Sequence, residues 1–93
     1  MLEPQLTIVN KLGLHARAAG KLVNLTKTFS SQVTLSRADE SNAEEVDGKS
    51  IMAVMLLAAP IGSELNIRVD GEDEAAAMTA ITELISNRFG EDE

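Results

Sequence analysis

Residues 6–19 read LTIVNKLGLHARAA, a stretch in which a strand, a glycine-containing loop and the start of a helix follow one another. Apolar and polar residues alternate over residues 5–10, which predicts a half-buried strand. Residues 11–14 are predicted to form a loop, in which Gly13 is free to adopt a backbone angle closed to other residues. The chain then enters a helix directly after His15. A strand–loop–helix unit with a histidine at its junction is therefore the first element of the fold.

Hydrophobic periodicity predicts the elements that continue the chain from this unit. They are a helix over residues 16–29, a strand over 31–37, a polar hairpin loop over 38–42, a short acidic edge strand over 43–46, a helix over 51–59, a strand over 64–70 and a helix over 72–89. Gly90 is expected to end the last helix, and residues 91–93 are expected to fray as a solvated tail. The order β-α-β-β-α-β-α predicts an α+β open-faced sandwich, with a four-stranded antiparallel sheet carrying three helices on one face.

Length and composition narrow the classes of protein to consider. The chain has 93 residues and 44% hydrophobic residues, which suits a single domain over residues 1–93. There is no cysteine and only one histidine, so disulfides and thiol catalysis are excluded and no metal site is expected. The net charge of −7 and the absence of Trp and Tyr argue against nucleic acid as a partner. The acidic charge either steers the chain toward basic patches on protein partners or only keeps it in solution.

No segment of the sequence predicts membrane insertion or export. The longest apolar run, residues 51–61, is too short to span a bilayer. Residues 1–10 have neither the basic start nor the long apolar stretch of a signal peptide. The expected location is the cytoplasm.

His15 is the candidate reactive group. A helix N-terminus carries partial positive charge, and its first N–H groups, here those of Ala16, Arg17 and Ala18, lack intrahelical acceptors. The guanidinium of Arg17 adds a fixed positive charge that suits a phosphate, and a neutral imidazole can attack a phosphoryl group near neutral pH. The same residues also fit an ordinary surface histidine or helix cap, so the local pattern leaves phosphoryl chemistry as one of two interpretations.

The helix over residues 51–59 contains no polar side chain. A short helix on a sheet buries one side, so Val54 would face the core while Ile51, Met52 and Met55 would lie on another face. Exposed apolar residues near a reactive group indicate a docking patch for partner proteins, and methionine adapts to several partners. The alternative is a more deeply buried helix in which all of these residues belong to the core.

Ser50 precedes this helix and has two interpretations that do not exclude each other. As an N-cap it would stabilise the helix start by about 1 kcal/mol. As a phosphorylation site it would place negative charge beside the apolar residues and weaken docking.

Together these residues resemble the HPr family of phosphocarrier proteins in the bacterial phosphotransferase system. The match covers nearly the whole chain, and its strongest parts are GLHAR at residues 13–17 and KSIMAVM at residues 49–55. The resemblance implies that the Nδ1 atom of His15 accepts a phosphoryl group from enzyme I and passes it to a histidine of an enzyme IIA protein. It also implies that Arg17 neutralises the phosphate and that Ile51, Met52 and Met55 dock partners.

The resemblance carries further expectations about regulation and assembly. Ser50 resembles the serine phosphorylated in bacteria that have an HPr kinase/phosphorylase. A relay protein of this kind is expected to be a monomer with an exposed His15, no cofactor and no turnover of its own. The sugar-uptake branch and the nitrogen-related paralogue, NPr, are both open, and so is a purely regulatory protein that binds partners stoichiometrically. A ligand-binding domain with a ferredoxin-like fold ranks below these, since nothing in the sequence marks a pocket.

Two features depart from the family pattern. Most members have proline where this chain has Ala18, and proline would preset the first helical turn. Alanine instead restores an N–H group at the helix start. The loop over residues 38–42 is also longer than in common members, and it is expected to extend the hairpin away from His15.

Overall fold

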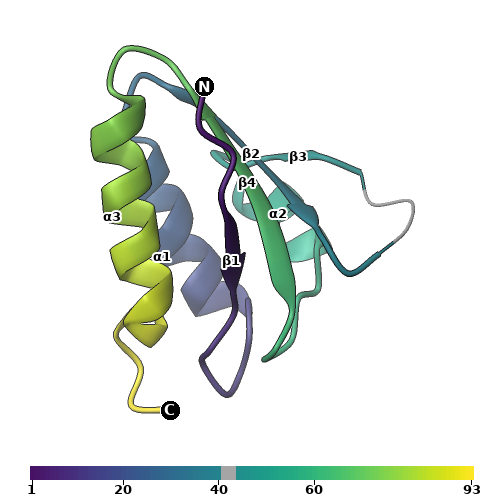
Figure 1. The fold of residues 1–93 in the computed structure, drawn as a ribbon. Helices are drawn as coiled ribbons and strands as arrows, with labels where there is room; N and C mark the ends of the chain where they lie inside the picture. Colours follow the sequence, from purple (N-terminus) through teal and green to yellow (C-terminus); the bar gives the residue numbers. More distant parts are fainter. Residues whose placement is uncertain (41–43) are drawn as a thin grey trace.

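The computed structural model describes residues 1–40 and 44–93 of the chain. These ranges form the strands β1 (Gln5–Thr7), β2 (Gln32–Arg37), β3 (Val46–Asp47) and β4 (Glu64–Asp70), and the helices α1 (Ala16–Thr26), α2 (Ile51–Leu56) and α3 (Glu74–Ser86), followed by the 3₁₀ helix η1 (Arg88–Gly90). The strands form one antiparallel sheet in the order β1-β4-β2-β3 (Figure 1). The predicted α+β open-faced sandwich is confirmed.

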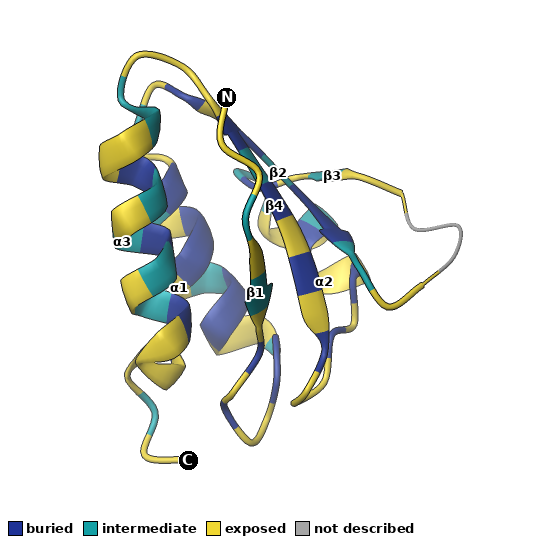
Figure 2. Cartoon of the chain, viewed as in Figure 1, coloured by how far each residue is buried: buried dark blue, intermediate teal, exposed yellow. Residues whose placement is uncertain are grey.

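Strand β4 is the centre of the hydrophobic core. Leu65, Ile67 and Val69 alternate with polar residues along it and are fully buried, as its period of two requires. Figure 2 shows the same alternation on β4 and the buried stripes of α1 and α3 that pack on this face. Leu35 of β2 lies opposite Ile67 and continues the buried layer across the sheet. The core therefore lies between one face of the sheet and the helices.

Several predicted boundaries are wrong by a few residues, and tertiary contacts explain the differences. Helix α2 ends at Leu56 rather than at residue 59, because Ala58 adopts a left-handed conformation with φ of 49°. The guanidinium of Arg37 donates to the carbonyl oxygens of Leu57 at 3.2 Å and Ala58 at 3.4 Å. These carbonyl oxygens at the end of α2 therefore have a hydrogen-bond donor outside the helix. Helix α1 ends at Thr26, whose buried hydroxyl donates to the Gly48 carbonyl at 2.7 Å.

Two strands, β1 and β3, also differ from their predictions. Strand β1 stops at Thr7, because the backbone of Ile8 bonds with Ser63 and Gly62 instead of continuing the ladder. Strand β3 pairs at Val46–Asp47. The predicted hairpin loop and edge strand, residues 38–42 and 43–46, fall partly on residues 41–43, which lie outside the described residues.

The C-terminal segment contradicts the prediction of a helix to residue 89 followed by a fraying tail. Helix α3 ends at Ser86, and Arg88, Phe89 and Gly90 then adopt positive φ angles of 56°, 53° and 77°. This reversal buries Phe89 completely and turns the tail back toward the loop between β1 and α1 (Figure 1). The Lys11 N–H donates to the Glu93 carbonyl oxygen at 2.9 Å. The tail is therefore part of the folded structure.

Two further findings concern the described ranges as a whole. No helix in residues 1–40 and 44–93 is long and apolar enough to cross a membrane. Within the same residues, no three His, Asp or Glu side chains gather into a group that would hold a metal ion.

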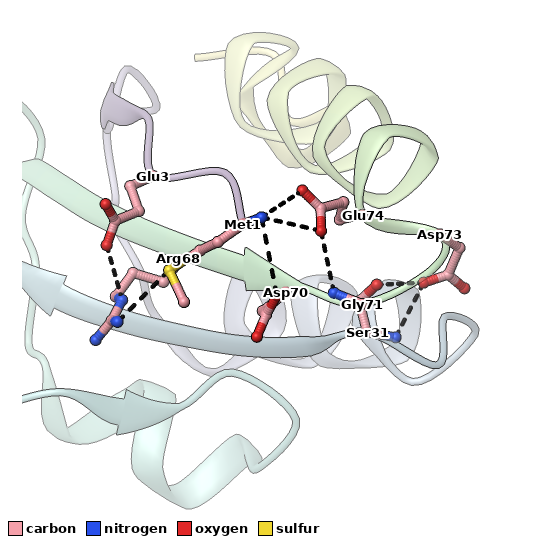
Figure 3. Close-up of polar contacts among 8 residues, drawn as sticks. All are labelled: Met1, Glu3, Ser31, Arg68, Asp70, Gly71, Asp73 and Glu74. Carbon is pink, nitrogen blue, oxygen red and sulfur yellow. Dashed lines mark hydrogen bonds and ion pairs between the residues drawn. The ribbon is translucent and has the colours of Figure 1, made fainter.

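Asp73 connects the start of α3 to the turn before β2. Its carboxylate accepts hydrogen bonds from the Ser31 N–H at 2.9 Å and from the Ser31 hydroxyl (Figure 3). It also accepts one from the backbone N–H of Ser30 at 2.8 Å. The bonds from Ser31 and Ser30 lower the pKa of Asp73 from 3.8 to about 2. In the same region, the amino group of Met1 contacts Glu74 at 2.8 Å. The ionised form of Asp73 is thus the form that the fold stabilises.

We expect Asp73→Asn to lower the free energy of unfolding at pH 7 and to flatten its dependence on pH. Since the pKa of Asp73 is lower in the folded state, its stabilisation is fully present above pH 3.8 and is lost as the pH falls through about 2. Urea unfolding at pH 7, 4 and 2 measures this, with Glu72→Gln, an exposed carboxylate of the same turn, as the control. An Asp73→Asn variant that loses as much stability as the wild type between pH 4 and pH 2 would contradict the assignment.

Candidate functional site

The loop before α1 is fixed in place by the segment that follows α2. Gly13 has φ of +68°, and a Cβ atom there would lie 2.5 Å from the carbonyl oxygen of Ala59. The Leu14 N–H donates to that same oxygen at 2.8 Å. Only glycine fits this approach, and the contact fixes the direction in which the chain enters α1.

His15 occupies the N-cap position of α1, with extended backbone angles and no hydrogen bond from its side chain to the helix start. Its carbonyl oxygen accepts the first intrahelical bond, from the Ala19 N–H at 2.8 Å. Among the described residues, the N–H groups of Ala16, Arg17 and Ala18 have no backbone acceptor. The structure therefore places the imidazole beside three free N–H donors, where the helix dipole favours an anion.

A surface hollow of about 790 Å³ opens beside His15. The charged and titratable side chains that line it are the cations Lys11, Arg17 and Lys21, the imidazole of His15, and the carboxylates of Glu91, Asp92 and Glu93. Lys21 Nζ donates to the Phe89 carbonyl oxygen at 2.6 Å and Lys11 pairs with Glu93 at 3.1 Å. Arg17 is exposed, and its guanidinium forms no hydrogen bond or ion pair with any part of the chain that the structure describes. The hollow thus has room and unused donors for a group of phosphate size.

His15 is less accessible than expected. Its side chain is 28% exposed, because the carboxylate of Glu91 contacts its Nε2 atom. The expectation of an exposed His15 is therefore wrong for one side of the ring. The cause is the C-terminal segment, which was expected to fray but instead folds back and places Glu91 against the ring. Glu91 itself is 13% exposed.

Asn10 holds the Glu91 carboxylate. Its side chain is completely buried, and its Nδ2 group donates to the Gly13 carbonyl at 2.8 Å and to Glu91 Oε1 at 2.9 Å. The hydrogen bond from Asn10, then the contact with His15 and the nearby charge of Lys21, lower the pKa of Glu91 below its ordinary value. The carboxylate is consequently ionised at neutral pH. The sequence interpretation missed both Asn10 and Glu91.

Helix α2 presents an exposed apolar patch, formed by Ile51, Met52, Met55 and Leu56. Met52 is 77% exposed and Leu56 is 80% exposed, whereas Val54 is fully buried. The exposed face predicted for Ile51, Met52 and Met55 is confirmed, and a helix buried on all sides is excluded. Leu56 was not predicted as part of this face. Its position one turn after Met52 on the same helix was the available signal.

Ser50 is the N-cap of α2, as predicted. Its hydroxyl oxygen accepts a hydrogen bond from the Ala53 N–H at 3.3 Å. The side chain is partly exposed and directly precedes the apolar patch. Lys49 lies beside it and donates from Nζ to the Phe29 carbonyl at 2.8 Å, which joins the start of α2 to the end of α1.

Comparison with known proteins gives consistent matches along the chain. A family model described as "PTS HPr component phosphorylation site" matches residues 2–87. A phosphocarrier protein HPr of Cupriavidus necator is 56% identical over 93 residues, which cover 100% of both chains. The crystal structure of HPr-C-His from Thermoanaerobacter tengcongensis has a TM-score of 0.89 and 38% identity, and the alignment covers 100% of both chains.

A structural neighbour also bears on assembly. The crystal structure of an HPr dimer from Thermoanaerobacter tengcongensis has a TM-score of 0.73 and 38% identity, over 98% of this chain and 100% of that one. The neighbouring structures therefore include a dimer, so the monomer expected from the sequence stays a prediction.

Proposed function

Because the chain belongs to the HPr family and is a phosphocarrier of the phosphotransferase system, we propose that His15 is the residue that carries the phosphoryl group. The donor in this proposal is enzyme I, charged from phosphoenolpyruvate, and the acceptor is a histidine of an enzyme IIA protein or domain. One observation carries the proposal. The imidazole of His15 lies at the N-terminus of α1, in the same hollow as the Arg17 guanidinium, which has no partner among the residues that the structure describes.

The transfer step follows from this arrangement. The Nδ1 lone pair of His15 forms a bond to phosphorus, while the bond from phosphorus to enzyme I breaks and its electron pair stays with enzyme I. The phosphoryl oxygens would then face the N–H groups of Ala16, Arg17 and Ala18 and the Arg17 guanidinium. These donors stabilise the phosphate without burying it. A relay needs such loose binding, because the group must leave again for enzyme IIA.

The apolar patch supplies the docking surface in this proposal. The segment after α2 contacts the loop that leads to His15, so a partner seated on Ile51, Met52, Met55 and Leu56 would lie close to the reactive ring. Enzyme I and enzyme IIA would use the same patch in turn. We place the chain in the cytoplasm as a monomeric single-domain carrier that needs no cofactor and has no turnover alone. The downstream partner decides between sugar transport and nitrogen-related regulation.

A reconstituted relay tests this function. Enzyme I, phosphoenolpyruvate, Mg²⁺ and an excess of an enzyme IIA protein are mixed with a small amount of the chain. The proposal expects phosphorylated enzyme IIA to exceed the amount of the chain many times, since each molecule carries phosphoryl groups repeatedly. Phosphorylation that stops on the chain and never reaches any enzyme IIA would instead support the stoichiometric regulator.

Ser50 is proposed as a regulatory phosphorylation site in hosts that have an HPr kinase/phosphorylase. Its hydroxyl is partly exposed and directly precedes Ile51 and Met52 of the apolar patch. A phosphate there would be tolerated by the helix N-terminus and would add negative charge beside the docking residues. Phosphorylation would therefore weaken docking without unfolding α2.

We expect Ser50→Asp to weaken binding to enzyme I roughly tenfold, the usual scale for a change of more than about 1 kcal/mol at an interface. Aspartate is itself a good N-cap, so the melting temperature should change little. Isothermal titration with enzyme I measures the affinity. Ser50→Asn, a capping residue without the charge, is the control. Equal affinities for the Asp and Asn variants would remove the proposed regulation.

A further inference from the structure

We propose that Glu91 is a positioning residue for His15, which holds the ring with Nε2 covered and Nδ1 free to react. This inference rests on the proposed function, since it concerns how the same ring is prepared for transfer. Glu91 lies 76 residues after His15 in the chain, and its Oε2 atom contacts His15 Nε2. Nothing in the local sequence around either residue indicates this contact.

The contact decides which ring nitrogen carries the proton. The lowered pKa of Glu91 keeps its carboxylate ionised at neutral pH, and an ionised carboxylate only accepts hydrogen bonds. Nε2 must therefore be the protonated nitrogen of the neutral ring and must donate to Glu91. Nδ1 then has the lone pair, and within the described residues it forms no hydrogen bond. The ring is held as the tautomer that attacks through Nδ1.

Two independent features hold Glu91 in place. Asn10 is completely buried and donates to Glu91 Oε1, while its own Oδ1 atom has no partner among the described residues. The three consecutive positive φ angles from Arg88 to Gly90 reverse the chain just before Glu91. Left-handed residues other than glycine cost free energy, and such strain persists where packing over-determines it, here through the buried Phe89.

The same carboxylate has an electrostatic role during transfer. When Nδ1 bonds to phosphorus and Nε2 keeps its proton, the ring becomes positively charged. The Glu91 carboxylate beside Nε2 stabilises that charge, as a carboxylate does for the imidazolium of a catalytic triad. When the phosphoryl group leaves, the ring returns to the neutral form. Glu91 therefore assists transfer in both directions without touching the phosphorus atom.

A small phosphoryl donor tests the positioning without any partner protein. Phosphoramidate phosphorylates imidazole nitrogens: the ring nitrogen bonds to phosphorus, the phosphorus–nitrogen bond of the reagent breaks, and ammonia leaves. We expect the wild type to yield only the Nδ1 isomer in phosphorus NMR, because Nε2 is covered. We expect Glu91→Ala to yield both isomers, because Nε2 becomes accessible.

Enzyme I provides the second readout. At saturating enzyme I, Glu91→Ala should lower the single-turnover transfer rate about tenfold with little change in affinity, as expected for the loss of one charge-assisted hydrogen bond. Glu91→Gln retains an acceptor oxygen but no charge, so its transfer rate should also fall. Glu72→Gln removes an exposed charge that lies outside the residues lining the hollow and is the control, with the wild-type isomer and rate.

The two readouts separate this inference from the proposed function. A single Nδ1 isomer from Glu91→Ala, or transfer rates of both Glu91 variants equal to the wild type, would overturn the positioning role. A wild type that enzyme I does not phosphorylate would overturn the proposed function instead. In that case the phosphoramidate isomers would still test whether Glu91 covers Nε2.

Discussion

The variant His15→Ala is expected to accept no phosphoryl group from enzyme I, while wild-type chain under the same conditions is fully labelled. His15 is the only histidine in the sequence, so the variant has no imidazole at the N-terminus of α1 or elsewhere. The free N–H groups and Arg17 remain, but they bind phosphate and cannot form a covalent bond to it. Intact mass spectrometry after incubation with enzyme I and phosphoenolpyruvate measures the label.

The fold of this variant should be intact. Among the described residues, the His15 side chain makes one polar contact, with Glu91, and Glu91 keeps its hydrogen bond from Asn10 in the variant. Thermal unfolding of the variant and the wild type provides the control. A folded His15→Ala protein that still acquires phosphate would show that another residue is the acceptor and that the site assignment is wrong.

The variant Met52→Glu is expected to slow transfer from enzyme I by roughly 10- to 100-fold at low enzyme I, the effect of altering a central interface residue. Met52 is 77% exposed on the apolar patch, so a glutamate there adds no charge to the core. It does place a carboxylate against any apolar partner surface, and burying an unpaired charge is costly. Transfer rates at varied enzyme I concentration separate weaker docking from slower chemistry.

Ala76→Glu is the matched control for Met52→Glu. It adds the same charge on the exposed side of α3, away from α2. Equal transfer rates for the two variants would mean that charge alone matters and that the patch is no docking surface. If Met52→Glu unfolds while Ala76→Glu does not, its slower transfer would reflect lost structure, and the docking role of the patch would be contradicted.

The parts of the fold that depend on local periodicity were predictable from the sequence. The strand over 64–70 and the last helix were predicted by periodicity, which the buried Leu65, Ile67 and Val69 of β4 and the buried Ile81 and Ile85 of α3 display. The boundaries were less predictable because distant groups set them. Arg37 of β2, for example, caps the end of α2 across a gap of about 20 residues in the chain, and no local pattern contains that contact.

The residues of the site also fall into two groups, those marked by a local sequence feature and those that depend on a distant contact. His15, Arg17, Ser50 and the patch could be found from sequence, because a helix start and an apolar helix face are local features. Glu91 could not, since its contact with His15 depends on the reversal after α3. Asn10 did leave a signal. It follows Leu6 and Ile8 at a spacing of two, so a polar residue occupies a core-facing position and needs buried partners.

Phosphorus NMR of the wild-type chain, after incubation with enzyme I, Mg²⁺ and phosphoenolpyruvate, shows whether His15 carries the phosphoryl group. Intact mass spectrometry of the same sample counts the phosphoryl groups. We expect one acid-labile phosphoryl group, bonded to Nδ1 of His15. An unmodified chain, with the same enzyme I shown to phosphorylate another HPr, or an acid-stable phosphate on a different residue, would contradict this expectation.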